Sequence, residues 1–366
     1  MYSGESSEVW FYRYFAGGTA LGGVKKLFSD IAEVVSPGDS VAVKVHMGEW
    51  GCTTHLRPAL VRRVCDCIKD VGGRPFVTDT TTLYPFRRYT ASKYLATAAF
   101  NGFSPETLQV PVVIADGEDG YDGEWVSVPR QLSDCPLERV RVAKEVVNAD
   151  SMIVLSHVKG HDLSGFGGSI KNVAMGCVTK ESKAAQHMAN RALVDPEKCT
   201  GCGKCVELCA YGALSVSDEK VVRDDGSCMN CGQCVVVCPE EVFAVPAGAR
   251  ERFQVWLAHA AAAVVGSFSG KVAFMNFVQD VTPLCDCATP SGLPVVPDVG
   301  ILAARDVVAI DKASLDLIAQ TTPIGAFRDI RSADVLGTIH ETDSLVQIRT
   351  AEKLGLGRMA YELTSI

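Results

Sequence analysis

The sequence predicts an α/β protein with a mainly parallel sheet, helices on both faces of the sheet, and a small inserted module. Apolar runs rich in β-branched residues alternate with helical segments through the first half of the chain, which is typical of this class. Two nearly identical cysteine runs then interrupt the alternation, which resumes after them. We therefore expect one discontinuous α/β domain, residues 1–192 and 247–366, with an insert at residues 193–246.

Four apolar runs before the insert predict buried strands. Strands of a parallel sheet are covered on both faces and read as continuous apolar stretches. A helix is predicted over residues 57–73, because Pro58 suits a first helical turn and the pair Gly72-Gly73 provides a stop. The expected strands are SVAVKVHM (40–47), RPFVTDT (74–80), VPVVIAD (110–116) and ADSMIVLSHV (149–158).

The pattern after the insert belongs to the same kind of domain. GKVAFMNFV (270–278) predicts a strand, VPDVGILAARDVVAI (296–310) is rich in strand-forming residues, and DKASLDLIAQ (311–320) predicts a helix. The two flanking segments resemble each other in pattern more than either resembles the insert. This favours one interrupted domain over three domains in a row.

Composition limits the classes of function. Of 366 residues, 47% are hydrophobic and 21% charged, so a large packed core is expected. The net charge of −8 argues against a nucleic-acid partner, which normally requires a basic face. The start of the chain does not read as a signal peptide, and the most apolar stretch, residues 258–265, is too short for a membrane span. With fifteen cysteines, the chain is expected to ligate metal in a reducing cytoplasm.

Eight cysteines of the insert predict two iron–sulfur clusters. Both runs follow C-x2-C-x2-C-x3-C, and over residues 195–245 the insert resembles a bacterial two-cluster ferredoxin. In that arrangement the fourth cysteine of each run ligates the other cluster. The alternative is a pair of zinc sites, which more often show two separated C-x2-C pairs. The expected [4Fe–4S] ligand sets are Cys199, Cys202, Cys205 and Cys238 for one cluster, and Cys228, Cys231, Cys234 and Cys209 for the other.

Two loops of the larger domain carry the remaining reactive groups. Segments 44–58 and 155–177 each follow or contain the end of a predicted strand, where open α/β sheets bind ligands. A single histidine is more often a hydrogen-bonded structural residue than a ligand, but several histidines gather here beside lysines and glycines. The predicted catalytic residues are His161, Lys171 and His187, and the predicted cofactor-binding residues are His46, His55, His157, Gly167 and Gly168.

The tripeptide Cys285-Asp286-Cys287 follows a predicted strand and belongs to the same rim. Two thiolates at this spacing could hold a soft metal, form a reducible pair or cap a turn. We include Cys285 and Cys287 among the candidate metal ligands. Cys65 and Cys67 show the same spacing but lie on a predicted helix, where they cannot share a face, so packing is expected for them.

These segments together resemble the domain-of-unknown-function 362 family, the iron–sulfur centre proteins. The resemblance rests on VKVHMGEWGCTTHLRP, PFVTDTTTLY, SHVKGHDLSGFGGSIKNVAMGC, CDC and VPDVGILAARDVVAIDKASLDL, and it covers nearly the whole chain. It implies an α/β fold and bound clusters. It implies little about the reaction.

A fainter similarity connects HDLSGFGGSIK (161–171) and His187 with the nickel-pincer lactate racemases. In that family the lysine anchors a pyridinium cofactor, one histidine binds its nickel and another acts as acid or base. The present chain has Ser169-Ile170 where an arginine is expected before the lysine, which puts attachment of that cofactor in doubt.

The sequence thus predicts a cytoplasmic iron–sulfur redox protein. Its two clusters would exchange electrons with a second site, which holds a further metal or an organic cofactor. A redox protein or a small molecule would be the partner. Two alternatives stay open: a non-catalytic electron or metal carrier, and a redox-neutral isomerase like the racemases.

Overall fold

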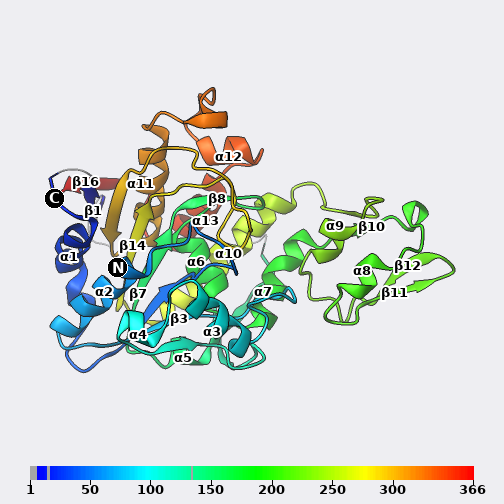
Figure 1. Ribbon diagram of the computed structural model, residues 1–366, viewed down its shortest axis with the longest axis horizontal. Helices are drawn as coiled ribbons and strands as arrows, with labels where there is room; N and C mark the ends of the chain where they lie inside the picture. The colour runs from blue at the N-terminus through cyan, green and yellow to red at the C-terminus, as the bar shows by residue number, and fades with distance from the viewer. Residues whose placement is uncertain (1–5, 15–16, 133–134) are drawn as a thin grey trace.

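A computed structural model describes residues 6–14, 17–132 and 135–366. Within them, eight strands form one central sheet in the order β16-β1-β15-β14-β7-β2-β3-β4 (Figure 1). The strands are β1 (Ser7–Arg13), β2 (Ser40–Val45), β3 (Arg74–Asp79), β4 (Val112–Ile114), β7 (Ser151–His157), β14 (Val272–Val278), β15 (Gly300–Ala304) and β16 (Tyr361–Ser365).

The sheet is mainly parallel, as predicted. Neighbouring strands from β14 to β4 pair in parallel, whereas β15 is antiparallel to both β14 and β1. Strands from before and after the insert lie side by side, because β14 pairs with β7. The α/β domain is therefore discontinuous in sequence.

The helices cover both faces of this sheet. Side chains alternate along β2, so Ala42 packs in one apolar cluster while Val41 and Val43 pack in the other. Helices of the first cluster are α6 (Ser169–Gly176), α10 (Ala249–Ser267), α11 (Val307–Ala319) and α13 (Leu345–Leu354). Helices of the second are α1 (Ala20–Ile31), α2 (Pro58–Asp70), α3 (Ala91–Phe100) and α4 (Pro105–Leu108).

Most predicted elements lie within a few residues of the observed ones, and one segment differs. Residues 296–310 contain the strand β15 and also the first turn of α11, which the sequence reading assigned to strand. Val307 and Val308 suggested a strand, but the Asp306 side chain accepts hydrogen bonds from the N–H groups of Val308 and Ala309 (2.8 and 2.9 Å). This cap starts the helix one residue later. The sequence does not predict the edge strand β16 or its neighbour β1.

The most apolar stretch of the chain lies inside α10. This helix packs against α6 and α13, and its alanines are buried on most sides. None of the described helices, α10 included, combines the length and the apolar composition that crossing a membrane requires.

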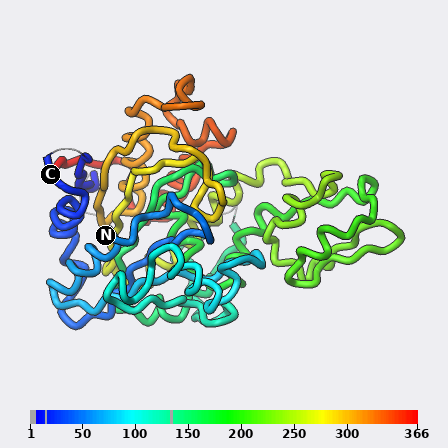
Figure 2. Tube along the Cα trace, in the orientation of Figure 1, coloured from blue at the N-terminus to red at the C-terminus, as the bar shows by residue number. Residues whose placement is uncertain are grey.

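Residues 193–246 form a module that projects from the rest of the molecule (Figures 1 and 2). Its first and last strands, β10 (Leu193–Val194) and β13 (Phe243–Ala244), pair with each other, so the chain enters and leaves at one place. A hairpin of β11 (Leu214–Ser217) and β12 (Lys220–Arg223) and two short helices complete it, α8 (Lys204–Glu207) and α9 (Gln233–Val237). The module has a small apolar cluster of its own.

Shorter elements connect these parts of the fold. They are β5 (Gly123–Ser127), β6 (Arg139–Ala143), α5 (Lys144–Val147), β8 (Lys159–His161), β9 (Gly165–Gly167), α7 (Lys180–His187) and α12 (Val335–Ile339).

Candidate functional site

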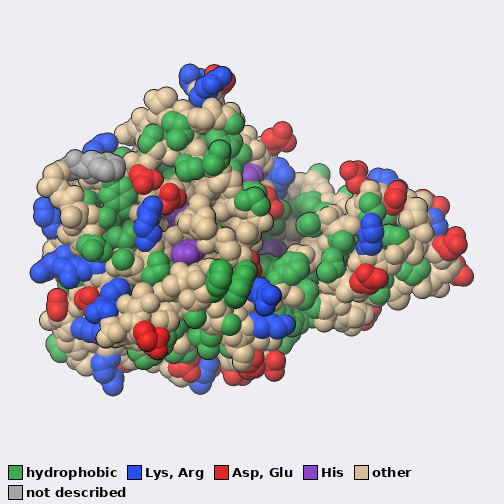
Figure 3. Space-filling model, viewed as in Figure 1, with side chains coloured by type: hydrophobic (Ala, Val, Ile, Leu, Met, Phe, Trp, Pro, Cys, Tyr) green, Lys and Arg blue, Asp and Glu red, His purple; other side chains and the backbone are tan. Residues whose placement is uncertain are grey.

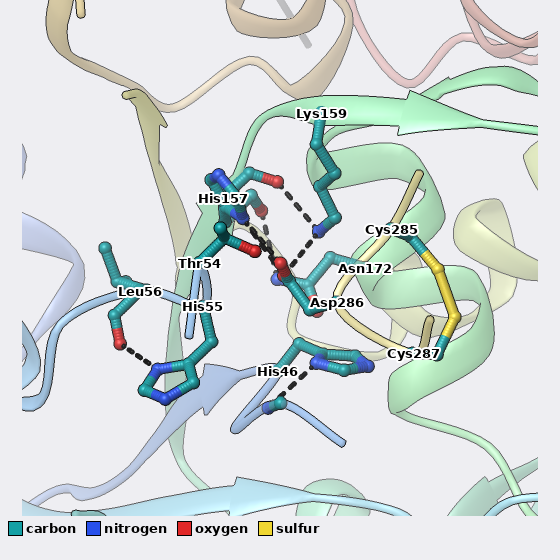
Figure 4. A network of polar contacts seen from close by, with 12 residues as sticks. His46, Thr54, His55, Leu56, His157, Lys159, Asn172, Cys285, Asp286 and Cys287 are labelled. Atoms are coloured by element: carbon teal, nitrogen blue, oxygen red, sulfur yellow. Dashed lines mark hydrogen bonds and ion pairs between the residues drawn. A yellow bond between two sulfur atoms is a disulfide. The ribbon is translucent and has the colours of Figure 1, made fainter. Parts of the chain in front are cut away.

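The candidate site lies at the carboxyl ends of β2, β7 and β14. These strands are parallel neighbours, so the segments that follow them meet at one edge of the sheet. His46 follows β2, His157 ends β7, and the loop after β14 carries the tripeptide at residues 285–287. Figure 4 shows the side chains from all three segments.

Asp286 is the central residue of this network. It is fully buried, and its carboxylate lies 2.9 and 3.0 Å from Nδ1 of His157 and 3.3 Å from Nζ of Lys159 (Figure 4). The other ring nitrogen of His157, Nε2, faces the carbonyl oxygens of Gln279 and Asp280 at 2.9 and 3.2 Å. Because both ring nitrogens face acceptors, His157 fits the doubly protonated state and has no free nitrogen for a ligand.

The surroundings of Asp286 favour its ionised form. Burial alone would raise the pKa of its carboxyl group, but the charges of His157 and Lys159 and the hydrogen bond from His157 hold that pKa well below its ordinary value. Asp286 is therefore the carboxylate that orients two buried cations.

His46 lies beside a second buried ion pair. Arg88 donates from Nε to Glu49 at 3.0 Å and from Nη2 to the Tyr84 hydroxyl at 2.6 Å, and its Nη1 lies 3.0 Å from Nε2 of His46. The backbone N–H of Gly48 donates to Nδ1 of His46 at 3.0 Å. Burial and the charge of Arg88 hold the pKa of His46 well below its ordinary value, so its ring is neutral.

His55 lies apart from this network. Its Nδ1 contacts the carbonyl oxygen of Leu56 at 3.1 Å, and its ring packs against Phe103 with 5.3 Å between ring centroids. Figure 4 places it away from Asp286 and the cysteine pair. The structure does not bring His55 together with the other candidate residues.

The three predicted catalytic residues lie within electrostatic reach of one another. His161 comes from β8, Lys171 from α6 and His187 from the end of α7. Burial and then the charge of Lys171 lower the pKa of His161 well below its ordinary value and that of His187 to about 4. Both histidines are therefore neutral at physiological pH.

Lys171 is a half-buried lysine that forms no salt bridge in the described part of the chain. Burial, and next the charge of Lys159, lower the pKa of Lys171 from 10.5 to about 8. Among the described residues, its Nζ atom forms no hydrogen bond. Lys159, by contrast, also donates to the carbonyl oxygen of His157 at 2.8 Å.

The two predicted glycines have different roles. A Cβ atom on Gly167 would lie 3.4 Å from Cδ of Lys171 and 3.7 Å from Cε of Lys159, so this glycine leaves space between the two lysines. A Cβ atom on Gly168 would lie 2.4 Å from the Asp311 carboxylate. That carboxylate already accepts from the N–H groups of Ser169 and Ile170 (2.7 and 2.9 Å) at the start of α6. Gly168 therefore serves packing, and the start of α6 is capped.

The charged groups of this network do not all pair. Lys159 and Lys171 are its lysines, Asp286 faces Lys159 and His157, and the charge of Lys159 also reaches the buried carboxyl group of Asp311. Lys171 forms no salt bridge in the described part of the chain, so it is the group that a small anion would pair with. Figure 3 shows histidine side chains in the hollow between the α/β domain and the insert.

Cys285 and Cys287 form a disulfide with each other, drawn in Figure 4. Cys285 is buried, and Cys287 is half-buried. Sulfur atoms joined in this way are not thiolates, so the predicted metal ligation by this pair applies only to the reduced form.

The eight cysteines of the insert are free thiols arranged around two cavities. Cys199, Cys202, Cys205 and Cys238 line a hollow with about 330 Å³ of empty space, including open solvent. A second hollow, with about 550 Å³ of empty space including open solvent, is lined by Cys209, Cys228, Cys231 and Cys234 and also by Cys205. The last cysteine of each run thus lies beside the first three of the other run.

Tyr211 connects the second cavity with the α/β domain. It lines that cavity, and its hydroxyl donates to the carbonyl oxygen of Leu83 at 2.6 Å. Its ring contacts Tyr89 edge-on, with centroids 6.2 Å apart. Leu83 and Tyr89 belong to the segment that also carries Tyr84 and Arg88, so one loop lies between the insert and the buried site.

Comparison with known proteins decides the family. The family described as "Domain of unknown function (DUF362)" matches residues 41–316. The chain belongs to this family.

Individual relatives of this DUF362 protein are distant. It is 26% identical over 182 residues to a thylakoid-associated protein of Synechocystis, a match covering 48% of this chain and 51% of that protein. The chain thus spans about half the length of this curated relative.

Two solved structures resemble it weakly, each at 11% identity. The lactate racemase apoprotein of Thermoanaerobacterium thermosaccharolyticum matches 75% of this chain and 51% of its own, with a TM-score of 0.35. A protein from Thermotoga maritima matches over 70% of this chain and 49% of its own, with a TM-score of 0.38. Likeness at this level says nothing about activity.

Sequence reasoning missed three residues of this DUF362 site: Arg88, Tyr211 and Asp311. Each acts across a long separation in sequence, since Tyr211 contacts a residue 128 positions away and Asp311 one 142 positions away. No local pattern marks such contacts. Asp286 did carry a signal, because it stands between two cysteines after a predicted strand.

Proposed function

We propose that this DUF362 protein is an iron–sulfur redox protein. Residues 193–246 hold two [4Fe–4S] clusters, and the pocket around Lys159 and Lys171 binds a small anionic molecule that exchanges electrons with them. The observation that carries the proposal is the sorting of eight free cysteines around two cavities.

The cysteine sets fit cubane clusters better than single ions. A cubane binds each thiolate at a different iron, so its four sulfur atoms stay apart, whereas zinc draws four ligands onto one centre. Among the described residues, no three Cys, His, Asp or Glu side chains lie close enough to hold one metal ion. The first set would hold one cluster through Cys199, Cys202, Cys205 and Cys238, and the second would hold the other through Cys209, Cys228, Cys231 and Cys234. When bound, such clusters supply one-electron transfer.

The α/β domain contributes the second site. Lys171 and Lys159 orient the anion, Gly167 leaves room for it, and the neutral His161 and His187 accept or donate a proton. Tyr211 supports a route from the second cysteine set, because it contacts both that cavity and the loop at residues 83–89.

A redox partner protein would meet the insert. Its 54 residues include nine acidic and four basic side chains, a balance of −5 against −8 for the whole chain. Acidic side chains are visible over its outer surface in Figure 3. A partner with a basic face would associate with it faster at low ionic strength. We place this exchange in the cytoplasm, where thiols stay reduced.

A redox-neutral isomerase is the second candidate. It is favoured by one observation, the grouping of neutral His161 and His187 around a lysine with a lowered pKa. Its activity would not depend on the oxidation state of the clusters. A non-catalytic carrier would turn over no small molecule in either state.

Four cysteine variants test the cluster assignment. We expect Cys238→Ser and Cys202→Ser to disturb the same cluster, and Cys209→Ser and Cys231→Ser the other, because each pair lines one cavity. Electron paramagnetic resonance of the anaerobically reduced variants separates the two signals. The assignment is wrong if Cys238→Ser removes the same signal as Cys231→Ser.

A further inference from the structure

The chain contains the tripeptide Cys-Asp-Cys twice, with different outcomes. Cys65 and Cys67 lie on α2, where residues two apart point to different sides, and both thiols are free and buried. Burial raises the pKa of Cys65 to about 12, so it is inert. Cys285 and Cys287 lie in a loop and are joined in a disulfide. Secondary structure, not the local sequence, makes the difference.

The disulfide is held at the edge of the basic pocket. Asp286, between the two cysteines, is bound through its carboxylate to His157 and Lys159. Its carbonyl oxygen accepts the N–H of Glu49 at 2.8 Å. The loop is therefore fixed from two sides, with Cys285 buried and Cys287 the less buried residue of the pair.

All fifteen cysteines are described, and thirteen of them are free. A disulfide that closes so short a loop constrains the unfolded chain little and so contributes little stability. In a reducing compartment, a single disulfide among free thiols is typically catalytic or redox-sensing.

We propose that Cys285 and Cys287 form a redox-active dithiol–disulfide couple that gathers two electrons at the edge of the pocket. The S–S bond breaks as two electrons and two protons from solvent arrive, and one S–H bond forms on each cysteine. The electrons come singly, one from each reduced iron–sulfur cluster, and each cluster is oxidised by one electron. The supply of these electrons by the clusters rests on the function proposed above. An outside thiol or disulfide exchanges at Cys287, the less buried cysteine of the pair.

Thiol trapping tests the couple independently of the clusters. The full-length protein is equilibrated anaerobically in mixtures of reduced and oxidised dithiothreitol, treated with iodoacetamide and analysed by mass spectrometry. We expect Cys285 and Cys287 to become alkylated together in one reversible two-electron transition. Cys65 and Cys67, the matched pair, should stay unlabelled while the protein is folded. The couple is refuted if Cys285 and Cys287 are protected at every ratio until denaturant is added, or labelled at every ratio.

A one-electron donor tests where the electrons come from. Reduced methyl viologen should expose both thiols in the wild type, and this labelling should be lost in the double variant Cys202→Ser/Cys231→Ser. Equal labelling of the two thiols in the wild type and the double variant would contradict the claim that the clusters supply the electrons to the disulfide. Iron analysis of the same wild-type sample separates the two proposals, since a chain without clusters refutes the proposed function while the dithiothreitol titration still decides the couple.

Discussion

Asp286 binds two buried cations, and the pocket depends on its charge. Replacing it with asparagine leaves His157 and Lys159 without their carboxylate. Removing one partner of a buried pair costs about 3–5 kcal/mol. We therefore expect Asp286→Asn to lower the free energy of unfolding by about this amount at neutral pH, measured by urea denaturation.

Asp286 should also make the free energy of unfolding depend on pH in the acid range. The folded pKa of Asp286 is below its ordinary value of 3.8, so its contribution is complete above that pH and is lost as the pH falls below it. Wild-type stability should decline more steeply in acid than that of the variant. Asp162→Asn, at an exposed carboxylate, is the control and should change stability by less than about 0.5 kcal/mol.

Lys171 should make stability depend on alkaline pH. Its pKa falls from 10.5 to about 8 on folding, so between these values the unfolded chain binds more protons and stability rises with pH. Lys171→Met should flatten this rise and stabilise the protein near pH 7. The measurement is the free energy of unfolding at several pH values.

A lysine that is paired with a carboxylate provides the control for Lys171. Lys312→Met removes a lysine paired with Asp316 on the same helix at 2.6 Å and should leave the alkaline slope unchanged. If Lys171→Met shows the wild-type slope, the lysine is not buried as a cation. Malonate, used as an anionic probe, should stabilise the wild type more than Lys171→Met, by mass action on the folded state.

Sequence reasoning reached individual site residues unevenly. It proposed His161, Lys171 and His187 because they flank a glycine-rich loop after a strand, and in the structure the three lie within electrostatic reach of one another. It could not foresee that both nitrogens of His157 face acceptors, because Asp286 and Gln279 lie more than a hundred positions away. Ring partners of this kind are set by the fold.

At the scale of elements, Tyr211 is one of the contacts that join the insert to the α/β domain, beside those of Arg191 with Asp225 and of Arg223 with Ala192. Tyr211→Phe removes its hydrogen bond to Leu83, which is worth about 0.5–1.5 kcal/mol. Amide hydrogens of residues 80–89 should then exchange faster, as measured by mass spectrometry. Tyr121→Phe, at a more exposed ring near the same loop, is the control. Unchanged exchange in Tyr211→Phe would mean that the insert is held elsewhere.

Helices and strands could be predicted from the sequence where all their residues are buried. Strands β7 and β14 are buried on every residue and stand out as continuous apolar runs. The start of α11 could not be predicted, because Val307 and Val308 favour strands locally while Asp306 caps a helix. The edge strand β16 and its neighbour β1 mix apolar and polar residues, so their pairing emerges only in the sheet.

At the scale of the whole molecule, the insert should be separable. Its terminal strands β10 and β13 pair, so the chain ends on the α/β side lie close together. Replacing residues 193–246 with a short glycine–serine linker should give a folded, colourless protein. Circular dichroism and cooperative unfolding check this.

The control for this replacement keeps the insert but not its cysteine sets. A full-length chain with Cys202→Ser and Cys231→Ser shows the effect of losing ligands alone. If the linker variant fails to fold while this control folds, the insert belongs to the core and the domain boundary is wrong.

The domain order itself could be predicted, because strand patterns on both sides of the cysteine runs match one sheet. The position of the insert relative to the pocket could not be predicted, because it depends on the hydrogen bond from Tyr211 to Leu83, which lies 128 positions away in the sequence.

The central claim is that residues 193–246 carry two [4Fe–4S] clusters. Its most direct test is iron and acid-labile sulfide analysis of anaerobically purified protein. Two cubanes predict about eight irons and eight sulfides per chain. A content of about two metals per chain, mostly zinc and without sulfide, would contradict the account.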